Sequence, residues 1–233
     1  MNAIRGVVFD CVGTLLHPHP PVDEVYKEAG LRGGVVAPRA VVLMRRRNQL
    51  RLEEDAHRRS GDSLARSPTS PERERQRWRN VVCAVFPEIL DEIEPVFERL
   101  WRHFAQPEHW RLAPGAAEVI EHLHRRGIVT AVASNFDERL RSVCAGHPPL
   151  AASMAIFSSA ELGWSKPSPE FFAAVTEQLD LPPESLLMVG DDLTNDGLGP
   201  RAAGWRSVLV ASGENSEGIP ILRDLRELPG FLG

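Results

Sequence analysis

The sequence has little cysteine, little lysine and no long apolar run. Its three cysteines, Cys11, Cys83 and Cys144, are widely spaced and include no C-x-x-C pair, which argues against a disulfide framework or a zinc site. No apolar stretch approaches the roughly 18 residues expected of a membrane helix. The first residues lack the apolar core and the cleavage site of a signal peptide. We therefore expect a cytoplasmic protein with reduced cysteines and no membrane partner.

A large surplus of one charge sign is also missing. The formal net charge is −5, with 25% charged and 42% hydrophobic residues among 233. These fractions are ordinary for a globular protein, and the weakly negative balance offers no attraction for nucleic acid. A chain of this length can bury a sizeable core, either as one large domain or as a domain with an insertion. We expect no nucleic-acid partner and a monomer or weak dimer.

Helices and strands alternate through the second half of the sequence. A β-branched run at residues 4–9 predicts a buried strand that ends at Asp10. The other expected strands are residues 128–133, 154–157, 186–189 and 206–210, and the expected helices are residues 115–126, 137–145, 169–179 and 195–203. This alternation predicts a parallel sheet with helices on its faces, which is a Rossmann-like three-layer α/β/α core.

The segment at residues 21–111 has another character, because it is rich in arginine and glutamate and shows helical periodicity without a convincing strand. Ser70 followed by Pro71 predicts the start of a helix. One face of that helix carries Trp78, Val81, Val82 and Val85. A second apolar pattern at residues 89–104 predicts another helix, which Pro95 should kink or split. We therefore expect an inserted helical-bundle cap.

This insertion predicts a core formed by residues 1–20 and 112–233, with the cap at residues 21–111 between them. The polar stretch at residues 58–71 is expected to be a loop that joins cap helices. Arginine clusters at residues 45–47 and 73–79 are expected to be solvated helix faces.

Four short polar motifs follow expected strands or lie in the loops after them. They are Asp10-Cys-Val12-Gly13-Thr14, Ser134-Asn135, Lys166 in Ser-Lys-Pro, and Gly190-Asp191-Asp192 with Asn195-Asp196. In a parallel sheet the carboxyl ends of the strands lie at one edge, which is where ligands bind. The motifs therefore bring an acidic nucleophile candidate, a hydroxyl, an ammonium and an acidic cluster to one pocket.

The order and wording of these motifs resemble the haloacid dehalogenase-like hydrolases over the whole chain, with the helical insertion matching their cap. The resemblance implies that Asp10 attacks the substrate and forms a covalent aspartyl intermediate that water hydrolyses. It also implies Mg²⁺ held by Asp10, the backbone carbonyl of Val12 and the acidic loop at Asp191. Asp192 and Asp196 add hard oxygen ligands of the kind that Mg²⁺ prefers. Asp196 either supports these ligands or caps the following helix.

The residue types agree with these roles. A carboxylate that attacks a phosphate dianion meets like-charge repulsion, which a cation and a nearby lysine reduce. Among 27 lysine and arginine residues only Lys27 and Lys166 are lysine, so Lys166 indicates a need for a compact point charge. Hydroxyl groups of Ser134 and Thr14, and the backbone N–H of Asn135, can donate to phosphoryl oxygens.

Val12 departs from the phosphatases of this family, which have a second aspartate there that protonates the leaving group. Loss of such a general acid costs roughly 10² to 10⁴ in rate. We favour Mg²⁺-dependent hydrolysis of a small phosphorylated metabolite that has a good leaving group or receives its proton from the cap or water. His17 or His19 is a candidate replacement acid. Cys11 is expected to be a small buried neighbour.

Two alternatives stay open. One is a haloacid dehalogenase or a phosphonatase-like hydrolase of C–X or C–P bonds. The acidic pair Asp191-Asp192 argues against a metal-free dehalogenase, and the phosphonate route needs a cap lysine, for which Lys27 is the candidate. The other is a non-catalytic relative that binds a phosphorylated ligand or a partner.

Overall fold

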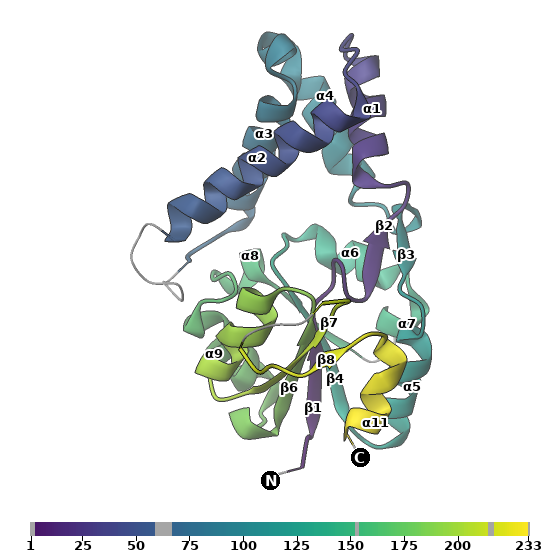
Figure 1. The fold of residues 1–233 in the computed structure, drawn as a ribbon, viewed down its shortest axis with the longest axis vertical. Coiled ribbons are helices and arrows are strands. Elements are labelled where there is room, and N and C mark those ends of the chain that lie inside the picture. Colours follow the sequence, from purple (N-terminus) through teal and green to yellow (C-terminus); the bar gives the residue numbers. More distant parts are fainter. Residues whose placement is uncertain (1–2, 59–66, 152–153, 214–216, 233) are drawn as a thin grey trace.

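A six-stranded parallel sheet forms the centre of the core (Figure 1). The computed structural model describes residues 3–58, 67–151, 154–213 and 217–232. The strand order is β5-β4-β1-β6-β7-β8. These strands are β1 (Gly6–Phe9), β4 (Val129–Ser134), β5 (Met154–Ser158), β6 (Leu186–Gly190), β7 (Arg206–Val210) and β8 (Ile221–Leu222). The predicted α/β fold is confirmed, with β8 as an additional edge strand.

The register of the sheet determines where the polar motifs lie. Phe9 at the end of β1 is paired with Val132 of β4 and with Val189 of β6. The backbone N–H of Asp10 donates to the carbonyl of Val189 at 2.8 Å, so the pairing continues one residue past the strand. The residues that follow these three strands therefore lie side by side at one edge.

Helices cover both faces of the sheet because successive side chains of each strand point to opposite sides. Val7 and Phe9 pack with α5, α6 and α11 in one apolar cluster, whereas Val8 packs with α9 in another. The core helices are α5 (Ala116–Arg125), α6 (Arg139–Ala145), α7 (Pro148–Ala151), α8 (Ser159–Leu162), α9 (Pro169–Leu179), α10 (Gly199–Ala202) and α11 (Leu228–Leu232). The predicted three-layer arrangement is thus present. The helix expected at residues 195–203 is divided into a π-helical turn, Leu193–Leu198, and α10.

A helical cap lies above the carboxyl ends of the strands (Figure 1). Its described α-helices are α1 (Val22–Arg32), α2 (Arg39–Arg58), α3 (Pro71–Val85) and α4 (Ile93–His103). They enclose an apolar cluster of their own, which includes Val42, Phe86 and Phe97. The cap therefore has a hydrophobic core separate from the two clusters that flank the sheet.

Two cap helices begin where elementary rules place them. The Ser70 hydroxyl accepts a hydrogen bond from the N–H of Arg73 at 3.2 Å, and Pro71 occupies the first turn of α3, as predicted. The helix expected from residue 89 begins only at Ile93, after a 3₁₀ turn at Pro87–Glu92. Of the kink or split predicted at Pro95, a split is observed, because the 3₁₀ turn ends and α4 begins two residues before this proline. Pro95 itself lies in the first turn of α4, where its missing N–H has no helical partner to lose.

Short extended segments connect core and cap, and they were not expected. β2 (Leu16–Pro18) pairs antiparallel with β3 (Trp110–Leu112), close to the predicted division between core and cap. On the other side, the N–H of Thr69 donates to Gly163 at 3.0 Å and the N–H of Ser165 donates to Ser67 at 2.9 Å. Of the loop expected at residues 58–71, residues 59–66 lie outside the described part. Three-residue strands are too short to give a periodic signal, so the sequence could not reveal them.

The longest described helix, α2, carries arginine at positions 45–47. No helix in the described part of the chain combines the length and the apolar character needed to cross a bilayer.

Candidate active site

Asp10 follows β1 and is nearly buried, with 7% of its surface exposed. The Ser134 hydroxyl donates to Oδ1 of Asp10 at 2.9 Å, and the ammonium of Lys166 donates to the same oxygen at 2.8 Å. Two donors on one oxygen fix the orientation of the carboxylate. The structure thus brings together three residues that the sequence placed in one pocket.

Lys166 is held more tightly than any surface lysine. The residue is 4% exposed, and its ammonium donates to Asp10 at 2.8 Å, to Asp196 at 2.6 Å and to the carbonyl of Ala133 at 3.0 Å. Burial alone lowers the pKa of Lys166, but the carboxylates of Asp10 and Asp196 outweigh burial and raise it. Lys166 is therefore a permanent positive charge at the floor of the site.

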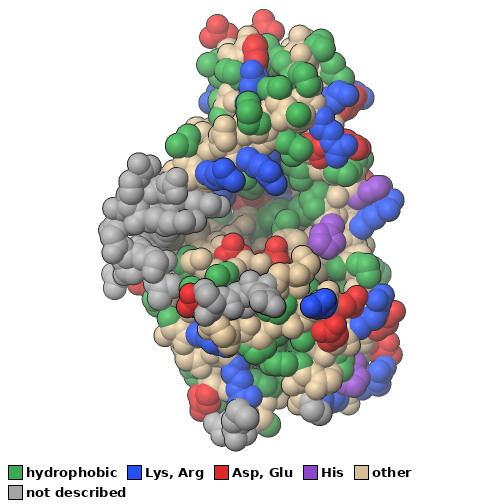
Figure 2. Space-filling view, viewed as in Figure 1, with side chains coloured by type: hydrophobic (Ala, Val, Ile, Leu, Met, Phe, Trp, Pro, Cys, Tyr) green, Lys and Arg blue, Asp and Glu red, His purple; other side chains and the backbone are tan. Residues whose placement is uncertain are grey.

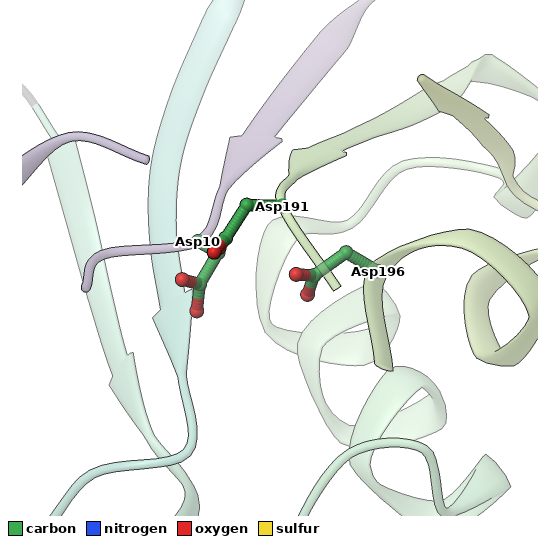
Figure 3. A group of neighbouring side chains, drawn as sticks. All are labelled: Asp10, Asp191 and Asp196. Atoms are coloured by element: carbon green, nitrogen blue, oxygen red, sulfur yellow. The ribbon is translucent and has the colours of Figure 1, made fainter. Parts of the chain in front are cut away.

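Three carboxylates surround a common space, as Figure 3 shows. Oxygens of Asp10, Asp191 and Asp196 all lie within 4.8 Å of one another. Burial raises the pKa of Asp196, and the ammonium of Lys166 opposes this effect. Partial desolvation and the charge of Asp10 raise the pKa of Asp191. One ammonium cannot balance three carboxylates, so the cluster has the charge and the hard oxygen donors that suit a divalent cation.

Two glycines allow these carboxylates to approach. Gly13 has a φ of 98°, and a Cβ atom there would lie 2.5 Å from Oδ2 of Asp191. A Cβ atom on Gly190 would overlap the side chain of Asp196. Beside Gly13, the Thr14 hydroxyl donates to Oδ1 of Asp191 at 3.2 Å. A side chain at either glycine would therefore displace part of the acidic cluster.

Asn135 has a contact that the sequence did not suggest. Its side-chain amide donates to the Lys166 carbonyl at 2.9 Å and accepts from the Lys166 N–H at 2.7 Å. This pair of hydrogen bonds ties the loop that carries Lys166 to the end of β4. The use of the Asn135 backbone N–H for a phosphoryl oxygen stays a prediction.

Asp192 and Asp196 have different surroundings. Asp192 accepts hydrogen bonds from the N–H groups of Thr194 at 2.9 Å and Asn195 at 2.7 Å, so it caps the helical turn that follows. It lies outside the group of three carboxylates. Asp196, for which capping was one of two options, instead accepts from Lys166 and from the N–H of Asp192 at 3.1 Å. The direct metal contact expected for Asp192 stays a prediction, with capping as its observed role.

Val12 projects toward the cap. Its side chain is 36% exposed and lines a cavity between core and cap, together with Pro18. His17 and His19 lie on either side of Pro18 in the sequence, and neither of them lines this cavity. Lys27 is exposed, and Tyr26 is the residue beside it that lines the cavity. These positions weaken the proposals of a histidine acid and of a Schiff-base lysine.

Cys11 is buried beside Asp10. A hydrogen bond with Cys144 and burial both raise the pKa of its thiol well above the usual value. A thiol that resists deprotonation is a poor nucleophile, which agrees with a packing role.

The cavity above Val12 has a volume of 160 Å³. Figure 2 shows the molecule hollowed between cap and core, with basic side chains above the hollow and acidic ones below it.

Arg46 of α2 lines this cavity, so the prediction that residues 45–47 all form a solvated face is wrong for Arg46. Val42, four residues earlier, is fully buried. Residues four apart lie on the same face of a helix, so the buried side of α2 at Val42 includes Arg46. This spacing was the signal in the sequence that could have identified Arg46.

The family model for a haloacid dehalogenase-like hydrolase matches residues 4–204, a range that includes all four motifs. The parallel α/β core, with its carboxylates and lysine at one edge of the sheet, is therefore the catalytic domain of a hydrolase. The chain belongs to the haloacid dehalogenase-like hydrolases.

Individual relatives agree with this assignment. The chain is 28% identical to the human haloacid dehalogenase-like hydrolase domain-containing protein 3, over 95% of this chain and 86% of the relative. It is 32% identical to a phosphoserine phosphatase of Thermus thermophilus over 62% of each chain. The structure is similar to that of a dehalogenase with an intermediate complex, with a TM-score of 0.74, 20% identity and coverage of 99% and 98%. It is also similar to the putative hydrolase YfnB of Bacillus subtilis bound to magnesium, with a TM-score of 0.73, 20% identity and full coverage of both chains.

Proposed function

We propose that this hydrolase removes the phosphoryl group from a small phosphorylated metabolite and that Asp10 is its nucleophile. The observation that carries the proposal is the Asp10 carboxylate, oriented by Ser134 and Lys166 and lying beside Asp191 and Asp196. Both hydrogen bonds that described residues donate to Asp10 end on Oδ1. The second oxygen can therefore attack phosphorus while the first stays held. Kinship with a phosphoserine phosphatase supports the reaction class.

Mg²⁺ fits the residues of this site. Carboxylate oxygens of Asp10 and Asp191, with the backbone oxygen of Val12, would hold the ion, while Asp196 is already engaged by Lys166. A bound Mg²⁺ supplies positive charge that offsets the repulsion between a carboxylate and a phosphate dianion. The excess of acid over base in the cluster supports this metal, as does the magnesium-bound state of the Bacillus relative.

The remaining polar groups bind the phosphoryl group. Lys166 contributes a fixed charge close to Asp10. The hydroxyl groups of Ser134 and Thr14 donate to Asp10 and Asp191 in this structure and would turn to donate to phosphoryl oxygens when a substrate binds. Asp10 displaces the leaving group and becomes an aspartyl phosphate, which water then hydrolyses to restore the carboxylate. Val12 has no proton to give, so the enzyme is suited to leaving groups that depart as anions.

A binding experiment tests the metal assignment. Calorimetry with Mg²⁺ should detect binding to the wild type and none to Asp191→Ala. Asp192→Asn is the matched variant, because asparagine preserves the helix cap and Asp192 lies outside the cluster. It should bind Mg²⁺ like the wild type if Asp192 acts only as the helix cap, and loss of binding would instead support the direct metal contact of Asp192. Equal binding by the wild type and Asp191→Ala would contradict the assignment.

A substrate screen tests the reaction. Acetyl phosphate, phenyl phosphate, an alkyl phosphate and an α-haloacid should be compared with Mg²⁺ present. We expect release of phosphate from the first two and no release of halide. Halide release without phosphate release would favour the dehalogenase alternative. A folded, Mg²⁺-binding protein that turns over none of these compounds would favour the non-catalytic relative.

A further inference from the structure

We propose that the cavity between core and cap accepts a single aromatic ring with an anionic substituent, so that the substrate is a monocyclic aryl phosphate whose carboxylate is bound by Arg46. The hydrolysis of an aryl phosphate rests on the phosphatase activity proposed above. The binding of the aromatic ring and its carboxylate rests on the cavity alone.

Aromatic side chains are concentrated around this cavity. Three of the five tryptophans, three of the nine phenylalanines and the only tyrosine of the chain line it. Trp78 and Trp101 belong to the cap, whereas Phe136 belongs to the core, so the aromatic surface closes over the space from both sides. Aromatic walls favour aromatic ligands through stacked and edge-to-face contacts.

The size of the cavity sets the size of the group. Its volume of 160 Å³ is close to the roughly 150 Å³ at which an engineered apolar cavity in another protein binds benzene. A single ring matches this volume. Val12 and Asn135 line the end that adjoins Asp10, so a ring in the cavity lies next to the phosphoryl site.

Arg46 gives the cavity a guanidinium that interacts with the Tyr26 hydroxyl but is paired with no carboxylate in the described part of the chain. Its Nε is buried and, within the described part of the chain, has no hydrogen-bond partner. The guanidinium carbon lies 6.0 Å from the centre of the Tyr26 ring. Arg139, the other arginine at the cavity, is already engaged by both carboxylate oxygens of Asp137 and by the Trp101 carbonyl. A half-buried guanidinium whose Nε is shielded from water gains most from an anionic partner, and a carboxylate on the ligand would provide one.

The chemistry at Val12 agrees with an aryl leaving group. An Asp10 oxygen bonds to phosphorus as the bond from phosphorus to the ring oxygen breaks, and the ring oxygen leaves with the electron pair as a phenolate. Water then cleaves the aspartyl phosphate into phosphate and the free carboxylate. A phenol has a pKa of about 10, well below that of the alcohol that an alkyl phosphate releases. The phenolate therefore leaves without the proton donor that Val12 cannot provide.

Four variants test the cavity in two matched pairs. Val22→Trp fills the cavity from α1, and Leu31→Trp adds the same side chain to an exposed position of that helix. Arg46→Gln removes the charge inside the cavity, and Arg47→Gln removes one from the exposed neighbour. Each protein is assayed with acetyl phosphate, phenyl phosphate and para-carboxyphenyl phosphate, after its melting curve shows that it is folded.

Val22→Trp should lower kcat/KM for both aryl phosphates by roughly 10- to 100-fold, as expected when a binding pocket is blocked, and by much less for acetyl phosphate, which has no ring. Arg46→Gln should lower kcat/KM for para-carboxyphenyl phosphate by about 10-fold or more and spare phenyl phosphate. Leu31→Trp and Arg47→Gln should match the wild type throughout. Equal losses for acetyl and aryl phosphates in Val22→Trp, or an undiminished carboxylate preference in Arg46→Gln, would overturn the inference.

Binding of the product separates this inference from the reaction. Calorimetry with para-hydroxybenzoate should show binding to the wild type, Leu31→Trp and Arg47→Gln and weaker binding to Val22→Trp and Arg46→Gln. If no phosphate is hydrolysed but this pattern is found, the proposed function fails and the ring site is supported. If phosphates are hydrolysed but para-hydroxybenzoate does not bind the wild type, the ring site is wrong and the phosphatase proposal survives.

Discussion

The core and the cap hold their functional side chains in opposite ways. In the core, each polar group is fixed by others, as Lys166 is by Asp10, Asp196 and the Ala133 carbonyl. In the cap, the cavity is lined mainly by apolar rings, and Arg46 has a buried nitrogen without a described partner. A rigid polar site suits chemistry that is the same for every substrate, and an apolar site with one unpaired charge suits selection among substrates.

The largest effect should come from the core nucleophile. Asp10→Asn keeps the shape of the side chain but removes its nucleophilicity, so turnover of acetyl phosphate should fall by about 10⁴-fold or more. Phosphate release measured beside a melting curve checks this. The variant should melt no lower than the wild type, because it removes one of three neighbouring negative charges. Near-normal turnover would show that chemistry occurs elsewhere.

The second effect concerns Val12, where core and cavity meet. Val12→Asp should raise turnover of an alkyl phosphate by up to roughly 10² to 10⁴, because it supplies the missing acid. Since Val12 is 36% exposed, the new carboxylate need not be buried. Val12→Asn adds polarity without a titratable proton and serves as the control. Equal gains in both variants would mean that polarity, rather than proton transfer, limits the wild type.

The third effect is on stability. Lys166→Met removes the only ammonium among three carboxylates, and loss of one partner of a buried ion pair costs about 3 to 5 kcal/mol. Urea unfolding at neutral pH without Mg²⁺ measures this loss. The unpaired carboxyls would have raised pKa values, so the deficit should shrink as the pH falls and they become protonated. Lys27, the chain's other lysine, is exposed. The free energy of unfolding of Lys27→Met should therefore stay within about 0.5 kcal/mol of the wild type.

The smallest effect belongs to the cap. Burial, followed by the charge of His109, lowers the pKa of His103 to about 4, and the two rings stack with centres 3.6 Å apart. The folded pKa is below the usual value of about 6.5, so the unfolded chain binds the proton first. This contribution to stability is complete above about pH 6.5 and is lost as the pH falls toward 4.

Urea unfolding between pH 7 and pH 4 tests this slope. His103→Asn should reduce the loss of stability on acidification, whereas His17→Asn, at an exposed histidine of β2, should not. An unchanged slope in His103→Asn would assign the acid sensitivity to other groups.

The sequence predicted the core better than the cap for a physical reason. Asp10, Ser134, Lys166 and Asp191 come together because parallel strands end at one edge, and the alternation of helices and strands predicts a parallel sheet. The cavity depends on side chains from several helices, whose relative rotation the sequence does not state. Arg46 was therefore grouped with its exposed neighbours. The pairing of Ser67–Thr69 with Gly163–Ser165 was equally invisible, because no local pattern encodes a contact between such distant segments.

The measurement that tests the central claim most directly is detection of the phosphorylated enzyme. Because Val12 cannot activate water, the aspartyl phosphate should be hydrolysed slowly and accumulate. Wild-type protein mixed with acetyl phosphate and Mg²⁺, quenched in acid and digested, should show one phosphoryl group on the peptide that contains Asp10. Hydroxylamine should remove that group, and Asp10→Asn should never acquire it. Steady hydrolysis of acetyl phosphate with no phosphoryl group on that peptide at any time would contradict the account.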